Sequence, residues 1–229
     1  MPVTPAQRLW IVVVSGFLAG TAHADPGSLN PDAFDLSGAL DRDVAPTRPG
    51  FELVIGAGYT QGVGGAGMIG SVEDLAGPGG HLEAQLAVRT SARFSVGAYG
   101  TLARFRRGDL IPDGDRAFGA TAGVQAVWHS RESRALDPWI GVGTGWRGLW
   151  RSPMGAPSSS EHGLELLRLQ LGIDYRISPA LAVTPMIGAS VSLFVIEGSA
   201  VSDGLSQVHD NRLNFYGFSG LLGRFDLGG

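Results

Sequence analysis

The sequence has 229 residues, among them 36 glycines and no cysteine. The absence of cysteine excludes disulfides, thiolate metal sites and cysteine nucleophiles. The net charge of −4 argues against a nucleic-acid partner, because phosphate binding needs a basic surface. Charged residues make up only 17% of the chain, whereas soluble domains usually contain about a quarter.

The first 24 residues have the features of an export signal. Arg8 and the amino terminus precede a mostly apolar run over 9–20, and Ala-His-Ala at 22–24 fits the small-x-small cleavage pattern. A short N-terminal membrane anchor is the alternative, although the run is shorter than the roughly 20 residues that span a bilayer. We expect cleavage before Asp25, with residues 25–49 forming a flexible periplasmic segment.

From residue 50 onward, apolar and polar residues alternate with period two, which is typical of half-buried strands. These strands are longer than the usual 5–6 residues and suit the roughly 9–11 residues of a tilted membrane-spanning strand. The predicted strands are 50–60, 80–89, 92–105, 116–129, 138–150, 163–176, 180–196 and 212–226.

Long and shorter links between these strands alternate along the chain. The long links, rich in Gly, Ser, Pro and Asp, are 61–79, 106–115, 151–162 and 197–211. The shorter links are 90–91, 130–137 and 177–179. This order is expected of an up-and-down barrel that has short turns at one end and long loops at the other. The sequence therefore predicts an all-β, eight-stranded antiparallel barrel over residues 50–229.

One face of each predicted strand is apolar, and the other mixes glycine, small polar groups and isolated charges. A soluble lipocalin-like barrel would turn the apolar face inward, and a membrane barrel would turn it outward. The polar face is too small and too rich in glycine for a solvated exterior, but it suits the narrow lumen of eight strands. Aromatic residues also gather near both strand ends, as at lipid–water interfaces, among them Trp139 at one end and Phe105 and Phe194 at the other. We therefore predict a transmembrane barrel with the apolar face outward.

The stretch "LDPWIGVGTGWRGLW" at 136–150 illustrates this arrangement. Gly141 and Gly143 are expected on the inner wall, where bulky neighbours need room. Trp139 and Trp150 are expected near the two interfaces. Because they are an odd number of residues apart, they can share a face only if a bulge separates them.

Two segments, "DPWIGVGTGW" and "YRISPALAVTP", resemble the strand and turn segments of small bacterial outer-membrane β-barrels of the OmpA, OmpX and OmpW type. The resemblance covers Phe51 to Phe225. It implies location in the outer membrane of a Gram-negative bacterium and insertion by the barrel-insertion machinery. Outer-membrane lipid and lipopolysaccharide are the partners that it implies.

Several charged residues fall on the predicted inner face. They have two interpretations: they line a narrow ion path, or opposite charges pair to fill a closed interior. We favour pairing, because buried charges need partners. The predicted lumen charges are Glu52, Glu83, Arg89, Arg93, Arg147, Arg168, Asp174 and Arg176.

The sequence shows no catalytic, cofactor or metal motif. No histidine belongs to a HExxH pattern. His129 and Ser130 are adjacent, so a strand would turn them to opposite sides, unlike the His and Ser two residues apart in lipid A deacylases. We therefore expect no cofactor and a structural or surface-interaction role carried by the long loops, whose ligand the sequence does not identify. The alternatives are an enzyme acting on membrane lipid and a narrow solute channel.

The alternation also predicts a register for the first hairpins. Placing Tyr59 opposite Leu82 aligns the apolar faces of the first two strands and sets Glu52 opposite Arg89. The next hairpin then brings Arg93 beside Arg89. We therefore expect Glu52 and Arg89 to lie close together inside the periplasmic end of the barrel.

Overall fold

The computed structural model describes residues 50–64, 72, 76–107, 116–130, 135–152, 158–199, 204–207 and 213–227. The predicted export signal at 1–24 and the predicted periplasmic segment at 25–49 lie outside these residues. Within the described part of the chain, no helix is long and apolar enough to cross a membrane.

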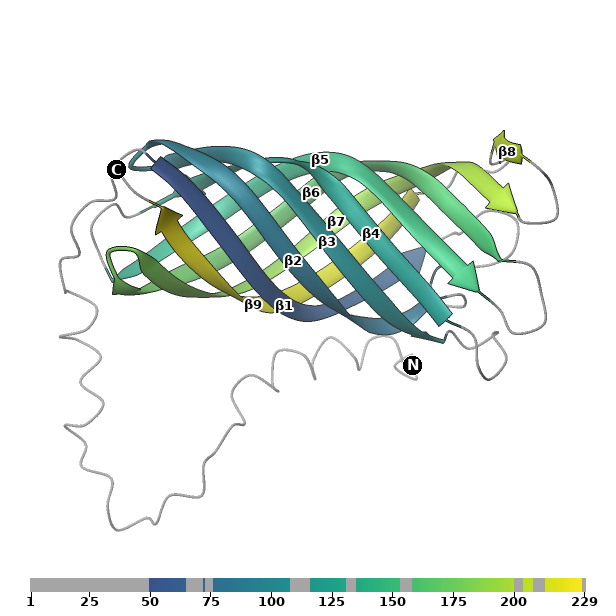
Figure 1. Ribbon diagram of the computed structural model, residues 1–229, viewed down its shortest axis with the longest axis horizontal. Helices are drawn as coiled ribbons and strands as arrows, with labels where there is room; N and C mark the ends of the chain where they lie inside the picture. Colours follow the sequence, from purple (N-terminus) through teal and green to yellow (C-terminus); the bar gives the residue numbers. More distant parts are fainter. Residues whose placement is uncertain are drawn as a thin grey trace, which may run out of the picture. The chain divides into compact units, whose positions relative to one another are not determined.

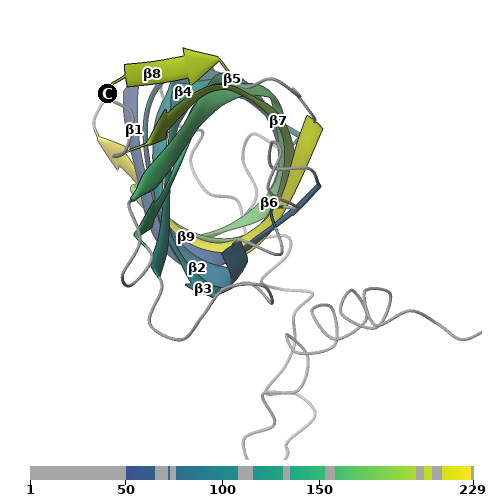
Figure 2. The ribbon, with the colours of Figure 1, turned by 90° about the vertical axis from the view of Figure 1, so that its right-hand side faces the viewer.

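Eight long antiparallel strands form a closed barrel (Figures 1 and 2). Consecutive strands pair along the chain, and β9 pairs with both β7 and β1, which closes the wall. The short strand β8 (Gly204–Gln207) pairs only with the last residues of β7. The barrel strands are β1 (Gly50–Gly64), β2 (Ala76–Ser91), β3 (Phe94–Arg107), β4 (Arg116–His129), β5 (Leu136–Ser152), β6 (Ser159–Ser178), β7 (Leu181–Ser199) and β9 (Leu213–Leu227). The predicted eight-stranded all-β barrel is confirmed.

The two ends of the barrel differ. At the turn end, residues 92–93, 130–135 and 179–180 connect the strands, and β1 begins and β9 ends there. The opposite end, where β5 ends and β6 begins, is called the loop end. The strands extend further than predicted on this side: β5 and β6 continue into the expected loop 151–162 and leave only 153–158 between them.

The wall has its apolar face outward and its polar face inward. On β2, Leu82 and Leu86 are 62% and 55% exposed, whereas Glu83 and Gln85 between them are 2% and 5% exposed. The same pattern runs along β6, where exposed leucines alternate with buried Arg168. Soluble proteins bury apolar side chains and expose charged ones, so this distribution is inverted. It confirms the faces assigned from the alternation.

Three aromatic residues expected at the interfaces lie inside the barrel instead. Trp139, Phe105 and Phe194 are only 4%, 6% and 3% exposed. The reason is parity: Trp139 is two residues from the inward-facing Gly141, and the β4–β5 register has no shift between them. Trp139 and Trp150 therefore stand on opposite faces of β5, and the bulge that would have placed both outside does not occur.

The predicted register of β1 against β2 is wrong by two residues. Tyr59 lies opposite Gly80, and Arg89 lies opposite Gly50. A shift of two preserves the face of every side chain. Because the outward positions of β2 around Leu82 are all apolar, the pattern could not distinguish the two registers.

The placement of Arg93 inside the lumen is also wrong. β2 extends to Ser91, with a bulge between Arg89 and Ser91, and Arg89 lies opposite Ser95 instead of Arg93. Arg93 falls in the two-residue turn, where its side chain is exposed and its carbonyl accepts a hydrogen bond from the His129 N–H, 2.8 Å away.

Glycines on the inner wall make room for large side chains. A Cβ at Gly172 would lie 2.5 Å from Cζ2 of Trp139, whereas a Cβ at Gly100, on the outward face between the buried Tyr99 and Thr101, would have its nearest neighbour at 3.8 Å. We expect Gly172→Ala to lower the free energy of unfolding by about 1–3 kcal/mol through overpacking. Gly100→Ala should leave it nearly unchanged. Urea unfolding of the refolded barrel, followed by tryptophan fluorescence, checks this; equal stabilities would contradict the packing account.

Candidate functional site: the polar lumen

Five buried side chains form a closed circuit of contacts around the lumen near the turn end, here called the charge ring. Glu52 of β1 accepts a hydrogen bond from Nε of Arg89 on β2, whose Nη2 lies 3.4 Å from Nε2 of His129 on β4. His129 Nδ1 lies 3.9 Å from Oδ2 of Asp174 on β6. That oxygen is 3.0 Å from Nε of Arg224 on β9, whose Nη1 is 3.1 Å from Oε2 of Glu52. The ring thus links five strands that enclose the lumen.

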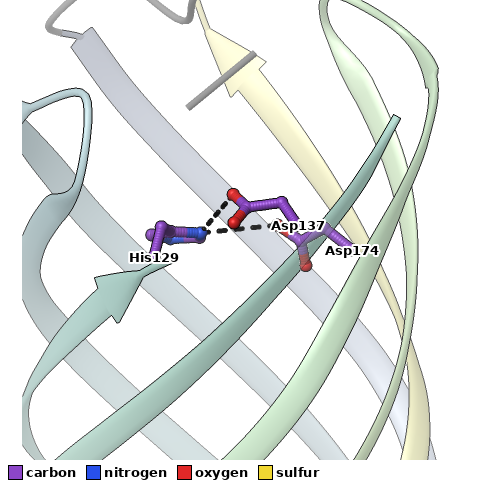
Figure 3. A group of neighbouring side chains, drawn as sticks. All are labelled: His129, Asp137 and Asp174. Carbon is purple, nitrogen blue, oxygen red and sulfur yellow. Dashed lines mark hydrogen bonds and ion pairs between the residues drawn. The ribbon is translucent and has the colours of Figure 1, made fainter. Parts of the chain in front are cut away.

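Neighbouring polar groups hold the acidic members of the ring in place. Oδ1 of Asp174 accepts hydrogen bonds from Trp139 Nε1 at 2.9 Å and from Thr184 Oγ1 at 2.7 Å. Asp137 lies 2.8 Å from Nδ1 of His129 (Figure 3). Since guanidinium groups only donate hydrogen bonds, the Arg89 contact makes Nε2 of His129 the acceptor and places the ring proton on Nδ1, facing Asp137.

His129, Asp137 and Asp174 offer three ligand atoms within 4.8 Å of one another, which is a spacing that suits a metal ion. Their arrangement disfavours a cation, because Arg224 occupies Oδ2 of Asp174 and Arg89 approaches the other face of His129. Two guanidinium groups already supply positive charge there. His129 and Asp174 therefore serve in the charge ring, and Asp137 contacts the ring through Nδ1 of His129.

A second layer crosses the full width of the lumen. Arg168 of β6 donates from Nη2 to Oε2 of Glu83 on β2, 2.8 Å away, and Gln170 donates to Oε1 at 3.0 Å. The strands β2 and β6 are four places apart in either direction around the wall. From β4, Gln125 joins this layer by donating to Gln85 at 2.5 Å. Side chains from opposite walls therefore meet at mid-barrel.

A third layer lies between mid-barrel and the loop end. Arg147 pairs with Glu165 at 2.5 Å, donates to Ser190 at 2.9 Å, and lies with its Cζ 3.8 Å from the centre of the Tyr216 ring. Tyr99 also donates to Glu165. Each carboxylate in these layers faces a guanidinium, as buried charges require.

The structure brings seven of the eight predicted lumen charges inside. These are Glu52, Glu83, Arg89, Arg147, Arg168, Asp174 and Arg176. Arg93 is the exception, as the turn geometry explains. The contact of Glu52 with Arg89 is confirmed. The two residues are not directly opposite, because the register differs by two and Glu52 lies opposite Ala87.

Several residues of the network were not predicted. Arg224 lies at an inward position that the alternation of its strand would have revealed. Asp137 falls in the predicted link 130–137, and it faces inward because β5 already begins at Leu136. Glu165 could not be found this way, because its parity with Leu167 predicts that it faces outward. A bulge between Glu165 and Leu167 changes the phase and turns Glu165 inward.

Comparisons with known proteins bear on the fold. No protein-family model and no curated protein matches the sequence. The crystal structure of Neisserial surface protein A aligns with 77% of this chain and 97% of its own, with a TM-score of 0.53 and 13% identity. The fold is that of a small outer-membrane β-barrel. The predicted resemblance is thereby confirmed for the fold, which is all that identity at this level shows.

Two further solved structures align over their entire length. The N-terminal β-barrel domain of Pseudomonas aeruginosa OprF covers 79% of this chain at 7% identity, with a TM-score of 0.47. Ail, the attachment invasion locus protein of Yersinia pestis, covers 78% at 16% identity, with a TM-score of 0.40.

The charge ring makes Glu52 a sensitive position, since it separates Arg89 from Arg224. We expect Glu52→Ala to lower the free energy of unfolding by about 3–5 kcal/mol, because two buried guanidinium groups lose their shared counter-charge. Glu52→Gln should cost less. The control is Arg93→Ala in the exposed turn at the same end, expected within about 0.5 kcal/mol of the parent. Urea unfolding measures all three, and a Glu52→Ala barrel as stable as the control would contradict the ring.

Proposed function

We propose that this chain is an outer-membrane protein of a Gram-negative bacterium, exported through the inner membrane and inserted by the barrel-insertion machinery. In this proposal the barrel is a closed, rigid base with a structural or surface-interaction role, and the segments at the loop end face the exterior. The observation that carries it is the inverted wall, apolar outside and charged inside.

The outward face supports the membrane location. Every barrel strand carries exposed side chains of leucine, isoleucine, valine or phenylalanine. Exposed aromatics also stand near the turn end, among them Phe51, Trp128 and Tyr175. Soluble monomers seldom expose apolar patches beyond a few hundred Å², whereas a lipid-facing wall must be apolar.

The interior supports a structural role over transport. The Glu83–Arg168 pair joins opposite walls, with the charge ring on one side of it and the Arg147–Glu165 layer on the other. An eight-stranded barrel has an interior just wide enough for side chains to fill. The surface ligand is therefore sought at the loop end, with outer-membrane lipid and lipopolysaccharide as the surrounding partners.

The membrane topology can be tested with single cysteines, because the chain has none of its own. Thr90 is exposed at the turn end and Ser158 is exposed at the loop end. We expect Ser158→Cys, and not Thr90→Cys, to react with a membrane-impermeant maleimide on intact cells. Both proteins should fractionate with the outer membrane. Labelling of Thr90→Cys alone would reverse the orientation, and recovery in the soluble periplasmic extract would refute the membrane location.

The closed lumen predicts that the purified barrel gives no stable porin-sized conductance in planar bilayers. The double variant Glu83→Ala/Arg168→Ala removes the pair that joins the walls without leaving a lone buried charge, and we expect it to conduct more often than the parent. Reproducible large steps from the parent protein would show that the interior is open and would favour the channel alternative.

A further inference from the structure

The outward face of the barrel carries two exposed arginines, Arg104 and Arg106 on β3. They follow the exposed Leu102, and the buried Ala103 and Phe105 alternate with them. Among the strand residues whose side chains the structure describes, they are the only charged ones on the outward face. Neither forms an ion pair with another described residue. Two adjacent cations on an apolar wall, with no anionic partner among the described residues, require a physical reason.

The strand register places these arginines among aromatic residues near the loop end. Arg104 lies opposite Phe118 of β4, and Phe118 lies opposite Trp150 of β5. The Phe118 and Trp150 rings are 5.8 Å apart, and Trp146 is 5.8 Å from Trp150. His162 of β6 stacks on Trp146 at 5.6 Å. Aromatic groups of this kind mark the lipid–water interface, so the arginines stand at the depth of lipid headgroups.

The wall is open on the other side of Arg104. Its partner on β2 is Gly80, which in turn lies opposite Tyr59 of β1. A Cβ built on Gly80 would have its nearest neighbour, the Gly58 carbonyl oxygen, 3.7 Å away, so no side chain of the described residues packs on Gly80 itself, between Tyr59 and Arg104. A ligand group can therefore approach the guanidinium along the wall.

An outward arginine is unfavourable in a membrane unless it has an anionic partner or reaches water. The cost is about 2–4 kcal/mol at the bilayer midplane and falls toward about 0–1 kcal/mol near the interface. The planar guanidinium matches the oxygens of a phosphate in two-point hydrogen bonding. Two such groups, two residues apart on one strand face, can hold one phosphate between them.

We propose that Arg104 and Arg106 bind a phosphate of an anionic lipid headgroup in the leaflet at the loop end. The space over Gly80 admits the headgroup beside Arg104, and Phe118 and Trp150 pack against the apolar part of the same lipid. This inference rests on the proposed membrane location and adds to it a defined site with a phosphate as its ligand.

The test uses the full-length mature barrel refolded in detergent and native mass spectrometry with a mixture of lipid A and dephosphorylated lipid A. We expect the parent to retain the phosphorylated lipid preferentially. Arg104→Gln/Arg106→Gln should weaken that binding about tenfold or more, since charge-assisted hydrogen bonds are lost. Arg93→Gln is the control: it removes one positive charge at the turn end, whereas the double variant removes two at the loop end, and it should bind as the parent does.

The outcomes separate the site from the membrane location. A parent that inserts into phosphatidylcholine vesicles but shows no preference for the phosphorylated lipid overturns this inference alone. A parent that does not insert refutes the proposed function. An equal loss in Arg93→Gln would show a net-charge effect and overturn the site.

Should the double glutamine variant fail to fold, Arg104→Lys/Arg106→Lys keeps the charge and removes the two-point geometry. It is expected to bind the phosphorylated lipid more weakly than the parent. Binding equal to the parent's would overturn the assigned role of the guanidinium geometry.

Discussion

Closure of the sheet is the constraint on which the rest of the structure depends. In a hydrocarbon environment every backbone N–H and C=O must find its partner within the protein, and an open sheet edge leaves a row of them unpaired. Pairing of β9 with β1 removes that edge. Once eight strands close, the side chains on the inner face share a narrow interior, and their volume and charge must balance there.

The inner-wall glycines and the paired lumen charges both follow from the need to balance side-chain volume and charge in this narrow interior. Bulky inner residues such as Trp139 and Tyr99 fit because the residues paired with them on the neighbouring strands are glycines, Gly172 and Gly123. The remaining interior is filled by carboxylates and guanidinium groups that contact one another in successive layers. Such pairs are weak evidence for stability, since desolvation opposes their attraction. In this barrel the ion pairs connect strands that are far apart in the wall, such as β2 and β6.

The outer surface follows a different rule. In the proposed membrane location, its composition is set by the lipid along most of its length and by the headgroup region at its ends. The stacked rings of Trp146 and His162 lie on the same wall as Arg104, so the loop end combines apolar, aromatic and cationic groups. A barrel whose interior is filled by its own side chains has this wall and its loops as the surfaces open to other molecules.

The sequence by itself determined the strands, their faces and the barrel, because period-two alternation depends only on which residues are neighbours along the chain. What the tertiary structure decided were the relations between strands. The β1–β2 register differs by two residues because apolar positions such as Leu82 and Leu86 match equally well in either alignment. A bulge turned Glu165 inward, and the extension of β2 to Ser91 left Arg93 in the turn. The partners within the charge ring come from five separate strands, and only closure of the wall brings them together.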